Sequence, residues 1–290
     1  MRGPGETGDF GVAMPEHDGQ MGANEPARDG DRPFRLGAVA YLNSRPLVCG
    51  LADDPGVDVR YDVPARLPAL LDDACVDAAL TPVIDLLDPK RAWKVVSDAC
   101  IGCDGETMTV RVFSRVPPDR VRRLWVDPAS HTSVVLARLI WRECHDCRLD
   151  VEPLADPSGA DGCGAVLLIG DKVITAAPYG FTYQMDLGAA WKALTGLPFV
   201  FAVWAAKAST PTESLAARLA AARDRGVASA AAIAREDGPR HGWPAGVAVT
   251  YLTRNLSFTL SPRHRAGMKR FLALGQAHGI LPCERDLVFA

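Results

Sequence analysis

Apolar runs of strand length alternate with amphipathic stretches along the chain from residue 34 onward. The first such runs are residues 35–40, 57–61 and 76–80, and residues 64–73 between them have a helical pattern that opens with a proline. A further helix is expected after Pro46. Strands that alternate with helices predict an α/β unit with a mostly parallel sheet flanked by helices.

A second unit of the same kind follows the break at Pro117 and Pro118. We expect strands at residues 124–126 and 165–169 and a helix at residues 132–143. The uninterrupted apolar character of residues 165–169 is typical of a strand that is buried on both faces. The chain therefore predicts two α/β lobes.

Two apolar segments are expected to join the lobes. Residues 108–114 would cross from lobe I to lobe II, and the strand 198–204, after a helix that stops at Gly196, is long enough to return. The remaining helices are expected to pack around lobe I; they are residues 212–223, 227–236, 246–254 and 263–275.

These crossings set the expected domain organisation. Residues 34–113 and 205–290 form lobe I, and residues 114–204 form lobe II. Residues 1–33 are rich in Gly, Pro, Asp and Glu, and we expect them to be a disordered extension. A chain that leaves one lobe and returns to it favours a ligand cleft between the lobes, where hinge closure excludes water.

Composition narrows the class of partner. Lys and Arg number 32 against 35 for Asp and Glu, so the net charge of −3 gives no basic field that would favour nucleic acid. No apolar run reaches the roughly 20 residues that cross a bilayer, so no membrane partner is expected. The first residues lack the basic start and apolar core of a secretory signal, which favours a cytoplasmic protein.

The eight cysteines include two CxxC pairs, Cys100 with Cys103 and Cys144 with Cys147. Such a gap lets two thiolates meet one metal, so a zinc or redox site is an alternative. The pairs lie too far apart for the usual zinc ribbon, and the other cysteines are scattered singly. Reduced structural thiols are therefore the favoured interpretation, with no metal site.

A series of motifs runs in order along the two lobes. The motifs are residues 39–47 (VAYLNSRPL), 79–83 (ALTPV), 101–105 (IGCDG), 130–133 (SHTS), 167–171 (LLIGD), 186–191 (DLGAAW), 196–204 (GLPFVFAVW) and 251–257 (YLTRNLS). Together they resemble the chorismate dehydratases of the futalosine route to menaquinone, and the first motif and residues 196–204 are the most distinctive.

This resemblance implies a type II periplasmic-binding-protein fold retained in the cytoplasm. It also implies a carbon–oxygen lyase that converts chorismate to 3-[(1-carboxyvinyl)oxy]benzoate and water. Because aromatisation of the ring supplies the driving force, no cofactor is expected. The expected partner is the small-molecule substrate, and a homodimer is compatible with these features.

Candidate site residues cluster at strand ends and at a helix start. Asn43 follows the first strand at its carboxyl end, where ligands lie in open α/β sheets. The residues before the helix at 132–143 offer hydroxyls and free backbone N–H groups to a carboxylate. With the resemblance, Asn43 and Thr109 are the expected catalytic residues. The expected substrate-binding residues are Tyr41, Thr81, Ser130, Thr132, Ser133, Gly170 and Asp171, with an indirect role preferred for Asp171.

The catalytic base stays open. Histidine is a common general base, but for His131, at a helix start, a structural or exposed role is the simpler interpretation. The hypothesis carried forward is that the enolpyruvyl carboxylate of the substrate takes the ring proton. Met108-Thr109 stands where relatives commonly carry Arg-Ser, which leaves open how this lobe neutralises a carboxylate. Arg45 and Arg111 are further candidate carboxylate partners, although a surface role is the default for both.

Three other functions remain open. The same hinged lobes could form a cytoplasmic sensor that binds a small anion without chemistry. The chain could be another enzyme of the same quinone pathway. The third alternative is a metal-binding regulator, which would use the two CxxC pairs as metal ligands.

Overall fold

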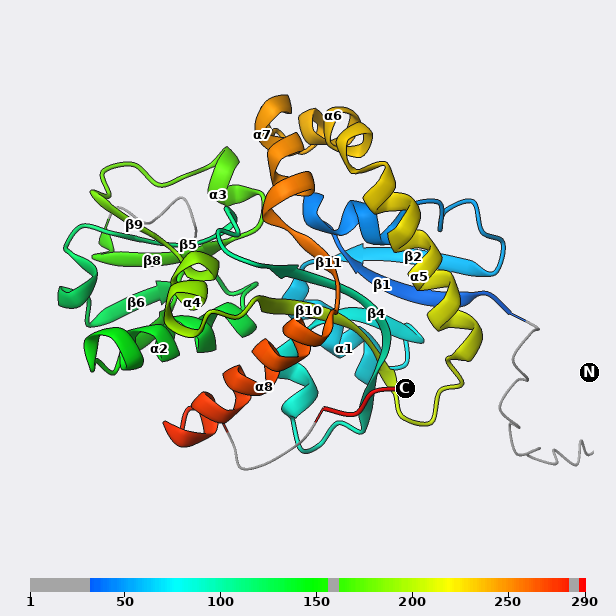
Figure 1. Ribbon diagram of the computed structural model, residues 1–290, viewed down its shortest axis with the longest axis horizontal. Coiled ribbons are helices and arrows are strands. Elements are labelled where there is room, and N and C mark those ends of the chain that lie inside the picture. Colours follow the sequence, from blue (N-terminus) through cyan, green and yellow to red (C-terminus); the bar gives the residue numbers. More distant parts are fainter. Residues whose placement is uncertain (1–31, 156–161, 282–286) are drawn as a thin grey trace, which may run out of the picture. The chain divides into compact units, whose positions relative to one another are not determined.

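Two β-sheets flanked by helices make up the structure, a computed structural model that describes residues 32–155, 162–281 and 287–290 (Figure 1). Nearly all of the expected N-terminal extension lies outside the described residues. The two sheets correspond to the two α/β units that the hydrophobic pattern predicts.

The first sheet has the strand order β11-β4-β10-β3-β1-β2, and the second has the order β7-β6-β8-β5-β9. The strands of the first sheet are β1 (Phe34–Val39), β2 (Val57–Asp62), β3 (Ala78–Pro82), β4 (Trp93–Cys103), β10 (Phe199–Lys207) and β11 (Ser257–Thr259). Those of the second are β5 (Val110–Ser114), β6 (Arg123–Val126), β7 (Asp150–Pro153), β8 (Ala165–Ile169) and β9 (Tyr183–Asp186).

One strand direction prevails in each sheet. β1 is parallel to β2 and β3, and β6 is parallel to β7 and β8. β10 runs antiparallel to β3 and β4, and β5 runs antiparallel to β8 and β9. These two strands oppose their neighbours because the chain enters each sheet there from the other lobe. The short edge strand β11 is also antiparallel to its neighbour β4.

The strand pairing divides the chain slightly earlier than the sequence pattern does. β5 pairs with strands of the second sheet, although the pattern assigns residues up to 113 to lobe I. All of β10 pairs within the first sheet, although the pattern assigns residues up to 204 to lobe II. A strand joins the sheet that satisfies its backbone groups, so the crossings lie in the short segments 104–109 and 196–198.

Helices cover the sheets, and α5 packs across the first of them (Figure 1). The α-helices are α1 (Leu67–Asp72), α2 (Thr132–His145), α3 (Lys172–Thr175), α4 (Leu187–Thr195), α5 (Glu213–Ala228), α6 (Ala230–Arg240), α7 (Ala245–Thr250) and α8 (Pro262–Ala277). The 3-10 helices are η1 (Leu42–Val48), η2 (Pro64–Arg66), η3 (Val83–Leu87) and η4 (Pro118–Arg120), and η6 (Tyr251–Asn255) is a π-helical turn.

Two helix predictions are wrong in detail. The helix expected after Pro46 is instead the short η1, which begins before the proline and contains it. The last helix, α8, packs into the core of the second sheet as well, because Phe271 meets Phe199 and Trp191 of α4 edge-on. The ring centroids lie 5.0 Å and 6.1 Å from that of Phe271. α8 therefore links the two lobes.

Candidate functional site

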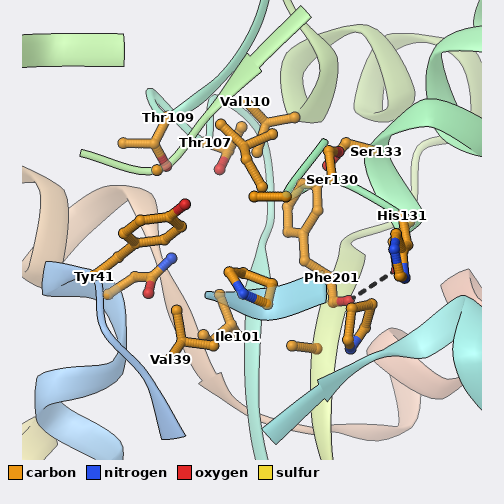
Figure 2. A pocket seen from close by; sticks show the side chains of 18 of the residues that line it. Val39, Tyr41, Ile101, Thr107, Thr109, Val110, Ser130, His131, Ser133 and Phe201 are labelled. Atoms are coloured by element: carbon orange, nitrogen blue, oxygen red, sulfur yellow. Dashed lines mark hydrogen bonds between the residues drawn. The ribbon is translucent and has the colours of Figure 1, made fainter. Parts of the chain in front are cut away.

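A cavity of about 550 Å³, part of it open to solvent, lies between the two lobes (Figure 2). Figure 2 shows Tyr41 and Thr109 on one side of it and Ser130, His131 and Ser133 on the other. The lining residues are Val39, Tyr41, Asn43, Pro64, Pro82, Ile101, Thr107, Thr109, Val110, Ala129, Ser130, His131, Thr132, Ser133, Ile169, Gly170, Phe201, Ala202, Tyr251 and Leu256. The cavity is apolar, with amide and hydroxyl groups at a few points.

Asn43 reaches the cavity from η1, directly after β1. Its Oδ1 atom is buried and has no hydrogen-bond partner among the described residues. Two contacts hold the turn in place, because the Ser44 hydroxyl donates to the carbonyl of Val39 and the backbone N–H of Leu42 donates to the carboxylate of Asp171 at 3.1 and 3.2 Å. An unsatisfied buried polar atom costs about 1–3 kcal/mol, so this oxygen is a natural partner for a ligand.

The start of α2 forms the opposite wall. Ser130 has a buried Oγ without a partner among the described residues, and Ser133 is buried beside it. No side chain caps the helix, so the backbone N–H groups of its first turn and the positive end of its dipole are available to an anion. Thr132 lines the cavity but is engaged elsewhere, since its hydroxyl donates to the carbonyl of Phe201 at 3.2 Å.

Thr109 is paired with Tyr251 across the cavity wall. Their hydroxyl oxygens lie 2.8 Å apart, and both side chains are buried. Burial raises the pKa of Tyr251 above its usual value, although hydrogen bonds with Thr109 and Asn43 act in the opposite direction. Tyr251 also stacks on Trp243, with ring centroids 4.7 Å apart. The tyrosine hydroxyl therefore stays protonated and connects two of the expected site residues.

Gly170 and Asp171 hold Tyr41 and η1 from the second lobe. Gly170 has φ of +72°, and a β-carbon placed on it would lie 2.6 Å from the ring of Tyr41. Asp171 lies behind the lining and accepts a hydrogen bond from Nδ1 of His241 at 2.8 Å as well as the one from Leu42. Burial raises the pKa of Asp171, against the opposing effect of His241. The indirect role expected for Asp171 stays a prediction.

Other expected residues have different surroundings. Thr81 is fully buried and does not line the cavity; its neighbour Pro82 does, and successive strand residues point to opposite faces. Arg45 pairs with Asp237 at 2.9 Å, and Arg111 contacts Glu106 and Gln184. Among the described residues that line the cavity there is no Lys or Arg.

His131 lies at the cavity instead of facing only solvent. Its Nδ1 atom is 2.8 Å from the carboxylate of Asp85 on η3, and its side chain is 35% exposed. Met108 has φ of +67°, and its backbone N–H and that of Thr107 donate to Asp186 at 2.7 and 3.0 Å. Asp186 thus fixes the crossing segment that delivers Thr109.

A profile of the protein family described as menaquinone biosynthesis matches residues 34–277. The chain belongs to this family. A chorismate dehydratase from Thermus thermophilus is 30% identical over 267 residues, which cover 84% of this chain and 96% of that protein. The match spans both lobes and every motif that lines the cavity, so the resemblance seen in the sequence is confirmed.

Solved structures of low sequence identity confirm the periplasmic-binding-protein-like fold. A protein from Archaeoglobus fulgidus has a TM-score of 0.67 at 13% identity, over 87% of this chain and 100% of that chain. The alkanesulfonate-binding protein from Xanthomonas axonopodis pv. citri has a TM-score of 0.63 at 15% identity, over 92% and 100% of the two chains. A Candida albicans protein with the generic periplasmic binding protein fold has a TM-score of 0.59 at 13% identity, over 88% and 92%.

The sequence alone misses Tyr251 as a site residue of this family member. The sequence carries one signal for it, because Tyr251 opens the last motif of the series. In the structure Tyr251 also begins a π-helical turn, a feature frequent at functional sites. Thr107 and Val110 are further lining residues that lie outside the motifs, whereas Ile101 and Phe201, which add to the apolar wall, lie within two of them. They come together only because the two lobes face each other.

Metal-ligand and membrane features are absent from the part of the chain that the structure describes. No group of three or more His, Cys, Asp or Glu side chains there could hold a metal ion. Burial raises the pKa of Cys103 to about 12, as expected for an unreactive thiol. In the same residues no helix is both long and apolar enough to span a bilayer.

Proposed function

We propose that this chain is a chorismate dehydratase, a cytoplasmic carbon–oxygen lyase that acts without a cofactor. Chorismate would lose its ring hydroxyl and the proton of the neighbouring ring carbon that carries the enolpyruvyl ether. The products are 3-[(1-carboxyvinyl)oxy]benzoate and one water. The curated relative from Thermus thermophilus and the family membership support this assignment.

The single observation that carries the proposal is a pair of unsatisfied polar atoms on facing walls. Asn43 Oδ1 and Ser130 Oγ are both buried and lack partners among the described residues, and both residues line the same cavity. Chorismate has carboxylates at two positions. The start of α2, with Ser130 and Ser133, suits one of them. On the other wall the Asn43 amide can donate from Nδ2 to the second carboxylate, while its Oδ1 can accept from the ring hydroxyl of the substrate.

The lining then defines the roles of its residues in the elimination. Asn43 would orient the enolpyruvyl carboxylate so that this carboxylate removes the ring proton. The Thr109–Tyr251 pair would hold the amide of Asn43 and the hydroxyl of the substrate ring by hydrogen bonds. The carboxylate can pass its proton to the departing hydroxyl, so the leaving group becomes water. The apolar wall excludes bulk solvent from the aromatising ring.

The decisive experiment mixes pure, chelator-treated protein with chorismate and identifies the product by mass and ultraviolet spectrum. Loss of one water with appearance of an aromatic acid is the expected result. Saturable binding with chorismate recovered intact would identify a binding or sensor protein instead. Activity that returned only after zinc addition would overturn the cofactor-free proposal.

Two substitutions test the assignment within the cavity. Asn43→Ala is expected to lower kcat about 100-fold or more, the usual loss when one positioned polar group is removed from a reacting centre. Ser130→Ala is expected to raise KM mainly, because Ser130 contributes to carboxylate binding. Ser209→Ala, at an exposed turn, is the matched control and should leave both parameters unchanged. Unchanged kcat in the correctly folded Asn43→Ala variant would remove this residue from the mechanism.

A further inference from the structure

A second concave site lies where α2 and α8 end, away from the α2 N-terminus that lines the substrate cavity. It encloses about 490 Å³, part of it open to solvent. We call it the arginine pocket; its lining is Arg138, Arg142, Cys147, Arg148, Leu149, His278, Gly279 and Ile280. Three arginines therefore line one hollow.

Two of these arginines have no counter-charge among the residues that the structure describes. Within the described residues, neither Arg138 nor Arg148 makes a hydrogen bond or an ion pair. Arg142 pairs with Asp146 at 3.5 Å, but the side chain of Asp146 is 98% exposed. Such exposed pairs contribute little. Converging guanidinium groups repel one another, and a bound anion would relieve that repulsion.

The helix dipole explains only part of this arrangement. Cations are favoured in the last turn of a helix, where Arg142 lies. Arg138 lies about two turns before the end of α2, and Arg148 lies beyond it, so neither is placed by that effect. His278 also lines the pocket and is hydrogen-bonded through Nε2 to the carboxylate of Glu143. The protein as a whole carries a net charge of −3, so a general basic bias does not produce the cluster.

We propose that the arginine pocket binds a small, multiply charged oxyanion of the phosphate class. Guanidinium forks match the oxygens of phosphate groups by paired hydrogen bonds. The buried floor formed by Cys147 and Leu149 gives the pocket a fixed shape. The site is independent of the elimination chemistry, and α2 carries it at one end and the substrate cavity at the other.

Isothermal titration of inorganic pyrophosphate into the full chain tests the proposal. One saturable site is expected, weakened by added salt. Arg148→Ala should bind at least about tenfold more weakly, the usual effect of losing one charge-assisted hydrogen bond. Arg235→Ala, an exposed arginine on α6, makes the same charge change elsewhere and should bind like the parent chain. Orthophosphate in a second series tells whether one phosphate group suffices.

Two results would overturn the assignment. Absence of saturable binding for both anions would remove the site. Equal affinity in the parent chain, Arg148→Ala and Arg138→Gln would place the anion elsewhere, for example at the start of α2. Because Arg148 is exposed, its truncation should leave the fold intact, and circular dichroism of each variant checks this.

Discussion

Gly170 offers a sharp test of how the second lobe shapes the cavity. Its φ of +72° lies in the left-handed region, and a β-carbon there would sit 2.6 Å from two ring atoms and 2.9 Å from a third ring atom of Tyr41. Gly170→Ala therefore adds backbone strain and also pushes Tyr41, whose ring lines the cavity. Backbone strain and displacement of Tyr41 can be separated, because alanine at a second glycine, Gly196, would add backbone strain alone.

The expected magnitudes follow from these contacts. A non-glycine residue in the left-handed region costs roughly 1–2 kcal/mol of stability. Forcing extra volume into a packed position adds typically about 1–3 kcal/mol. Gly196 has φ of +70°, and a β-carbon placed on it would have no neighbour within 4 Å among the described residues, so Gly196→Ala should lose only the first amount. Gly170→Ala should lose both, for a total of about 2–5 kcal/mol.

Urea unfolding and steady-state turnover measure these effects together. Gly170→Ala is expected to lower kcat/KM for chorismate because Tyr41 is displaced, whereas Gly196→Ala should be less stable but equally active. Equal stability losses in the two variants, or full activity in folded Gly170→Ala, would show that Tyr41 does not need the glycine. The contact with Gly170 would then be incidental to the site.

Two further predictions concern stability. Burial alone would raise the pKa of Asp77, but hydrogen bonds from Arg32 and Arg35 outweigh it and hold the pKa well below its usual value. The ionised form is therefore favoured by folding, so Asp77→Asn should lose about 1–3 kcal/mol near neutral pH, and its deficit should shrink as pH falls below about 4; a pH-independent deficit in urea unfolding would contradict this. Phe271→Ala should lose about 3–5 kcal/mol because it opens a cavity in the α8 contact with Phe199, as thermal unfolding would measure.

The hydrophobic pattern predicts most of the architecture because each strand is a short buried run with clear boundaries. β1 and β8 match their expected ranges within a residue. The antiparallel direction of β10, which lies between β4 and β3, could not be predicted, because it depends on the end of the first sheet at which the returning chain enters. The packing of α8 could not be predicted either. The apolar Phe271 could belong to the core of either lobe until the positions of Trp191 and Phe199 are known.

A site residue could be predicted where a single segment of the sequence determines both its position in the fold and its chemical group. Asn43 and Ser130 follow local rules, a strand end and a helix start. Tyr251 follows no such local rule. Its place in the site depends on a hydrogen bond with Thr109, which lies 142 residues away in the sequence. Arg45 and Arg111 have suitable chemistry for a ligand carboxylate, but each pairs with a carboxylate of the protein itself, which agrees with the surface role that was the default for both.

A cavity lined by neutral donors suits the proposed proton transfer better than one lined by cations. A guanidinium beside the enolpyruvyl carboxylate would lower the pKa of that group and weaken it as a base. The amide of Asn43 can orient the same carboxylate with a smaller effect on its basicity. Met108 in place of a basic residue is then no defect for this step, because its backbone N–H anchors the crossing segment on Asp186 while Thr109 carries the hydroxyl. The absence of Lys and Arg from the described lining is thus consistent with a substrate that supplies its own base.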